Sequence, residues 1–158
     1  MKNKWIIVGV VAVSVLLGGA LAAAHSYNPI KWIKKGPSPT ASEQLAANKE
    51  EEKKLSLQLQ ALLPPRTSLK DACAGFKNLN DCVAALHVSH NLKIKFNCLK
   101  WDVTGAKPAG DVKSCAAPSH DKAINLGKAI RGMKPDANSR SEAKTAEKRA
   151  REDIQDAS

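Results

Sequence analysis

The hydrophobic pattern begins with an uncharged apolar run from Trp5 to Ala24, directly after Lys2 and Lys4. At a rise of about 1.5 Å per residue, a helix of this length spans about 30 Å, the thickness of the hydrocarbon core of a bilayer. The run therefore predicts a segment that is either held in a membrane or used for export across one.

The end of the apolar run fits two interpretations. Ala22 and Ala24 form the small-x-small pattern of a signal-peptidase site. However, the run is longer than the usual hydrophobic region of a cleaved signal. The aromatic and basic residues typical of a bilayer interface follow it, namely Tyr27, Lys31, Trp32, Lys34 and Lys35. We expect an uncleaved signal anchor over residues 1–35, with release near Ala24 as the alternative.

A linker and a stalk helix are expected over residues 36–65. The Gly-Pro-Ser-Pro cluster at 36–39 interrupts regular structure. Thr40 and Glu43 then have the spacing of a capping box, which predicts the start of a helix. From Ala41 to Leu63 the chain is rich in good helix formers and is stopped by two prolines. We expect one continuous helix whose last leucines dock on the following domain.

Short helical patterns fill residues 66–135. Apolar spacing predicts helices over Leu69–Phe76 and Asp81–His90, and a third helix that ends at Gly105. Residues 92–96 alternate as in a strand, but the helical spacing that follows them favours a helix. This part of the chain therefore predicts a small helical domain.

The pattern after this point predicts a loop and two more helices. Residues 106–118 contain Gly, Pro and Ser and are expected to form an ordered loop. Ser119 is expected to cap the next helix, and Ser139 with Glu142 forms a second capping box. The final helix, over residues 136–158, is polar nearly all round. The predicted fold class is all-α.

Four cysteines fall within the central domain: Cys73, Cys82, Cys98 and Cys115. An even number in a small, exported domain predicts two disulfides, each of which adds about 2–4 kcal/mol of stability. Three pairings are possible. We favour Cys73–Cys82 and Cys98–Cys115, because each closes a short loop and the second would fix the irregular segment.

The alternative chemistry is a metal site at the paired histidines. His87 and His90 stand three residues apart on a predicted helix, with Cys82 near, so a metal-dependent enzyme using both histidines is a weaker hypothesis. The chain lacks a Cys-x-x-Cys pair, a nucleophile elbow, a phosphate-binding glycine loop and a metalloprotease helix motif. We therefore expect no catalytic residue, no metal and no cofactor.

The excess of basic residues indicates which kinds of molecule the chain could bind. The chain carries a formal net charge of +10, and residues 64–135 hold twelve basic against five acidic side chains. Such an excess favours anionic partners through long-range attraction, such as phospholipid headgroups or acidic polymers of a cell envelope. Aromatic interleaving and a clustered basic recognition helix are missing from the sequence, which argues against nucleic acid. The expected partner is the lipid bilayer, through residues 5–24. An anionic envelope surface is a further candidate, and the simpler interpretation of the scattered lysines is an ordinary solvated surface.

Several short strings resemble those of small exported or membrane-anchored bacterial proteins that have no assigned activity. The resemblance covers roughly residues 75–155 and is carried by Phe76–Leu79, Val83–Ser89, Phe96, Leu99–Lys100, Thr104–Gly105, Leu126–Gly127 and Lys134–Pro135. It implies an export signal and a small helical module. It implies no activity and assigns no functional residues.

These observations lead to one functional expectation and one alternative. We expect a single-pass membrane protein whose N-terminus lies inside and whose disulfide-bonded domain lies outside the cytoplasm. Its expected role is a non-catalytic interaction or structural module of the envelope. The alternative is a secreted or periplasmic binding protein released by cleavage near Ala24.

Overall fold

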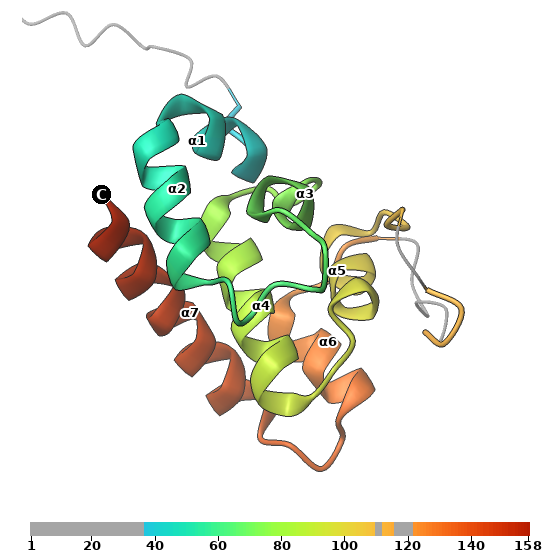
Figure 1. The fold of residues 1–158 in the computed structure, drawn as a ribbon. Helices are drawn as coiled ribbons and strands as arrows, with labels where there is room; N and C mark the ends of the chain where they lie inside the picture. Colours follow the sequence, from blue (N-terminus) through green and yellow to red (C-terminus); the bar gives the residue numbers. More distant parts are fainter. Residues whose placement is uncertain (1–36, 110–111, 116–121) are drawn as a thin grey trace, which may run out of the picture. The chain divides into compact units, whose positions relative to one another are not determined.

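The computed structural model describes residues 37–109, 112–115 and 122–158. These ranges contain helices and no strand (Figure 1), which confirms the all-α class. The helices are α1 (Ala41–Ala47), α2 (Lys49–Gln58), α3 (Leu69–Cys73), α4 (Leu79–Leu92), α5 (Phe96–Thr104), α6 (Leu126–Met133) and α7 (Ser139–Ala157).

The predicted signal anchor over residues 1–35 lies outside the described residues, as do Ala22 and Ala24 of the candidate cleavage site. Among the helices that the structure does describe, none has the length and apolar character needed to cross a bilayer. The anchor therefore stays a prediction from the sequence.

The predicted stalk helix is broken in two at Asn48. This residue adopts an extended backbone conformation, and its side-chain oxygen accepts hydrogen bonds from the backbone N–H groups of Glu50 (3.2 Å) and Glu51 (3.3 Å). Asn48 thus ends α1 and caps α2. The prediction of one helix from Ala41 to Leu63 is wrong, because a short polar side chain competes for backbone donors and favours a cap over a helix interior.

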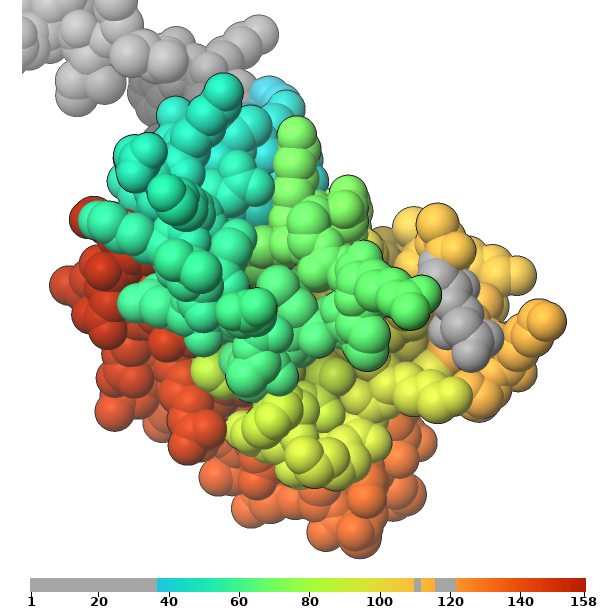
Figure 2. All heavy atoms as spheres, viewed as in Figure 1, coloured from blue at the N-terminus to red at the C-terminus, as the bar shows by residue number. Residues whose placement is uncertain are grey.

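Leucines attach α1 and α2 to the rest of the body. Leu45, Leu55 and Leu59 are at most 2 % exposed, whereas Leu57, on another face of α2, is 66 % exposed. Helix α2 packs on α7, and Figure 2 shows the two lying against each other on one face of the molecule. The end of the predicted stalk is therefore part of the folded body.

Helix α4 is the centre of the body and packs against α1, α3, α5, α6 and α7. The side chain of Asn78 caps it by accepting a hydrogen bond from the backbone N–H of Asp81 (2.9 Å). It ends where Lys93 adopts a left-handed conformation, with φ of 54°. Residues 93–95 therefore connect α4 to α5. The prediction of a helix through residues 92–96 is wrong for this connection, and α5 begins at Phe96.

The last two helices begin after asparagine caps, and not after the serine caps that the sequence predicts. Asn125 caps α6, so this helix starts later than a cap at Ser119 implies; Ser119 itself lies outside the described residues. Asn138 caps α7 by accepting from the backbone N–H of Ser141 (3.2 Å), which makes Ser139 the first helical residue and corrects its predicted role as the cap.

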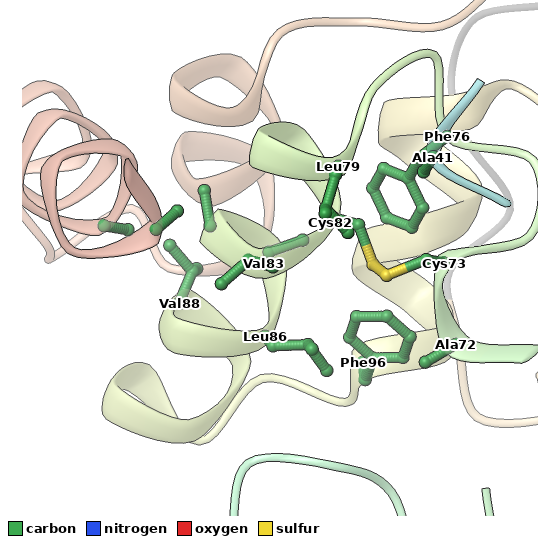
Figure 3. Close-up of a cluster of buried hydrophobic side chains, with 14 of the residues drawn as sticks. Ala41, Ala72, Cys73, Phe76, Leu79, Cys82, Val83, Leu86, Val88 and Phe96 are labelled. Atoms are coloured by element: carbon green, nitrogen blue, oxygen red, sulfur yellow. A yellow bond between two sulfur atoms is a disulfide. The ribbon is translucent and has the colours of Figure 1, made fainter. Parts of the chain in front are cut away.

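Two aromatic rings and a disulfide form one end of the core. The rings of Phe76 and Phe96 have centroids 6.3 Å apart, and the bond between Cys73 and Cys82 lies between them (Figure 3). Leu79 and Leu86 of α4 extend this cluster along the helix. The disulfide thus supplies core volume in a body with few aromatic side chains.

Candidate functional site

The four cysteines form two disulfides. Cys73 is bonded to Cys82 and Cys98 to Cys115, with Cα atoms 5.3 Å apart in both pairs. The pairing is the one favoured from the sequence. The first bond is fully buried, whereas both cysteines of the second are partly exposed. The second bond joins α5 to the segment around Cys115, so both bonds have a structural role.

The two histidines lie in different environments. His87 is buried against α7, where its Nε2 lies 2.6 Å from Oδ2 of Asp153, whereas His90 is exposed. Cys82 is bonded to Cys73 in a disulfide, so it has no thiolate with which to bind a metal ion. The structure therefore does not unite the three side chains of the metal hypothesis. Across the described residues, no three His, Cys, Asp or Glu side chains are grouped in a way that would hold a metal ion.

A cleft of about 490 Å³ lies between α3, α5 and residues 106–109. The Nζ of Lys100 donates a hydrogen bond to the backbone carbonyl of Asp71 (3.0 Å). Burial lowers the pKa of Lys100, and the nearby Asp71 carboxylate partly offsets this effect. The second lysine of the cleft, Lys107, lies 5.7 Å from the ring centroid of Trp101. Both lysines thus have contacts within the body.

In the part of the chain that the structure describes, a hollow between α6 and α7 is lined mostly by charged side chains. We call this feature the basic groove: it has a volume of about 390 Å³, and four cationic side chains line it together with a single acidic one. The cations are Lys128, Arg131, Arg140 and Lys144, and the acid is Glu147. All four cations are exposed, so they meet a ligand without a large desolvation cost.

The fold brings these cations together by burying the opposite faces of both helices. Helix α6 buries Leu126, Ala129 and Ile130, and α7 buries a stripe of alanines that begins at Ala143. Lys128 and Arg131 stand three residues apart on the exposed side of α6, and Arg140 and Lys144 stand four apart on that of α7. These spacings place each pair on one helix face.

Small residues of both helices line the basic groove between the cations, namely Gly127, Ser139 and Ala143. A Cβ atom added at Gly127 would lie 3.6 Å from the carbonyl oxygen of Ser139 and 3.8 Å from the Cβ of Ala143. These are ordinary van der Waals distances, so Gly127 packs against the first turns of α7 between the two pairs of cations. The cationic side chains form the two sides of the groove, one pair from α6 and one pair from α7.

The excess of basic residues is evident in the sequence, but the groove is not. Two of its cations belong to the strongly basic segment 64–135, and two belong to the C-terminal segment, where acidic residues predominate. The spacing of the two pairs was the available signal. It does not show that the two helices pack side by side, which depends on tertiary contacts.

Comparison with protein-family models, with curated proteins and with solved structures found no match to this chain. The resemblance to small exported bacterial proteins therefore stays a prediction from the sequence.

Proposed function

We propose that this chain is a single-pass, membrane-anchored protein whose helical body lies outside the cytoplasm and serves as a non-catalytic interaction module of the cell envelope. The observation that carries the proposal is the pair of disulfides, Cys73–Cys82 and Cys98–Cys115. Structural disulfides form and persist in oxidising compartments and are rare in the cytosol. The apolar run at residues 5–24 supplies the route across the membrane.

The interaction role draws on the basic groove. Its four exposed cations face a shared hollow, and such an arrangement attracts anionic groups over distances set by ionic strength. The proposal therefore assigns the module an anionic partner at the envelope surface. It assigns no catalytic residue.

The placement is tested by labelling lysines with a membrane-impermeant acylating reagent, on intact cells that produce the full chain and on the same cells after lysis. If the cell has an outer membrane, that membrane is first made permeable. We expect the exposed Lys53 and Lys54 of α2 to react in intact cells, and Lys2 and Lys4 to react only after lysis. This pattern would place the body outside and the N-terminus inside.

Two results would overturn the proposal in different ways. If Lys53 and Lys54 also need lysis to react, the body lies in the cytoplasm. If peptides that contain Lys2 and Lys4 are missing from the mature protein, the N-terminal segment has been removed. The secreted alternative, with release near Ala24, would then replace the anchored form.

A further inference from the structure

We propose that the basic groove is a binding surface for the anionic phospholipid headgroups of the membrane that holds the anchor. This proposal rests on the proposed function, because it takes the body to be attached to a bilayer. It adds a specific surface and a specific ligand chemistry: phosphate groups contacted by Lys128, Arg131, Arg140 and Lys144.

The charges of the groove are available to a ligand. Among the residues that the structure describes, ion pairs join His87 to Asp153 and Lys148 to Glu152, and neither pair includes any of the four cations. Glu147 is the single acidic residue of the lining and is partly buried. The lining of the groove therefore has an excess of positive charge, with four basic side chains against one acidic side chain.

Phosphate groups match this lining because arginine and lysine bind phosphate through charge-assisted hydrogen bonds. Near an anionic membrane, each basic side chain strengthens attachment about fivefold. Four such side chains acting together strengthen it by roughly several hundredfold. This gain in affinity is too small to hold a separate soluble protein on a membrane. It is large enough to keep a body that is already anchored there in contact with the headgroups.

The length of the tether favours the membrane over a soluble polymer as the partner. Even fully extended, the chain from Ala24 to the start of α1 at Ala41 reaches about 60 Å at most. A body confined so close to the bilayer meets headgroups in an intramolecular event, with effective concentrations on the order of millimolar. A soluble polymer has no such advantage.

The test uses the full chain reconstituted in vesicles of neutral phosphatidylcholine, with or without added anionic phosphatidylglycerol. A membrane-impermeant acylating reagent is applied at low salt, and mass spectrometry gives the reaction rate of each lysine. We expect Lys128 and Lys144 to react at least fivefold more slowly in the anionic vesicles, and high salt to abolish the difference. Lys53 and Lys54, exposed on α2, are internal references whose rates stay unchanged.

A pair of charge-matched variants tests whether the groove itself causes the protection. Lys128→Glu with Lys144→Glu alters the groove, and Lys53→Glu with Lys54→Glu makes the same change of charge on α2. The readout is modification of Arg131 and Arg140 by phenylglyoxal, with exposed Arg149 as reference. We expect anionic vesicles to protect both arginines in the α2 variant and not in the groove variant, while both variants keep the same helix content.

A failure of the membrane anchor and a failure of the lipid-binding groove give different results. A chain that fails to float with neutral vesicles contradicts the anchor. A chain that floats but whose groove lysines react equally in both kinds of vesicle contradicts the lipid-binding groove and leaves the anchor intact. Equal protection by millimolar inorganic phosphate in neutral vesicles would also overturn the headgroup assignment, because the groove would then take soluble phosphate.

Discussion

Nε2 of His87 lies 2.6 Å from Oδ2 of Asp153, and this contact joins the central helix α4 to the C-terminal helix α7. Helix α7 otherwise meets the body mainly through alanines, which each bury little apolar surface. The imidazole is 11 % exposed and the carboxylate 28 %. The pair therefore supplies a directional contact between α4 and a helix whose other buried side chains are mainly alanines.

The first prediction concerns this pair. Asp153→Ala leaves the buried imidazole without its acceptor, and we expect a loss of about 1–3 kcal/mol in the free energy of unfolding. Glu152→Ala is the matched control, because Glu152 is 54 % exposed and pairs only with exposed Lys148. That variant should lose less than about 0.5 kcal/mol. Urea denaturation measures both values, and equal losses would contradict the assigned role of Asp153.

The second prediction compares two glycines. Gly105 has a φ of +72°, and a Cβ added there would lie 2.7 Å from the backbone nitrogen of Ala123. We expect Gly105→Ala to cost about 2–4 kcal/mol, because the backbone strain adds to a clash that no side chain can relieve.

Gly132 provides the control, since its added Cβ would meet nothing within 4 Å and it lies within helix α6. Gly132→Ala should stabilise the protein by about 0.5–1 kcal/mol, because alanine favours the helix and restricts the unfolded chain. Thermal denaturation of the two variants measures the contrast. A Gly105→Ala protein as stable as the unmodified chain would contradict the close approach of Gly105 to Ala123.

The third prediction concerns the order in which the disulfides are reduced. The Cys73–Cys82 bond is fully buried between aromatic rings, whereas the Cys98–Cys115 bond is partly exposed. Since reduction requires a thiolate to reach a sulfur atom, we expect a mild reductant to open Cys98–Cys115 first under native conditions. Alkylation followed by peptide mass spectrometry identifies the freed thiols. Simultaneous opening of both bonds in the folded protein would contradict this order.

The fourth prediction concerns the protonation of Lys100. Burial lowers its pKa below the ordinary value of 10.5, and the charge of Asp71 partly restores it. Between the two pKa values the unfolded chain holds the proton and the folded chain does not, so the stability contributed by Lys100 rises with pH through that window. Titration by NMR should show a pKa below 10.5 for Lys100. Asp71→Asn should lower it further, and an increase would contradict the assigned effect of Asp71.

The sequence predicted the helical class and the cysteine pairing because both depend on local spacing. It failed at Asn48 and Asn138, where the cap is an asparagine next to residues that fit a helix equally well. These errors of boundary arise because capping depends on backbone angles that neighbouring contacts decide. The basic groove could not be predicted from the sequence for a different reason. Its two helices contribute separate pairs of cations, and only the packing of the helices brings Arg131 and Arg140 to one groove.

The central claim is that an N-terminal anchor holds a disulfide-bonded body outside the cytoplasm. The most direct test is the intact mass of the protein extracted from the membranes of producing cells, with free thiols blocked by alkylation at lysis. We predict a mass that still includes residues 1–24 and lacks the four hydrogens lost in forming two disulfides, and no alkylated cysteine. A chain with four alkylated cysteines would contradict the oxidising location, and a chain without residues 1–24 would contradict the anchor.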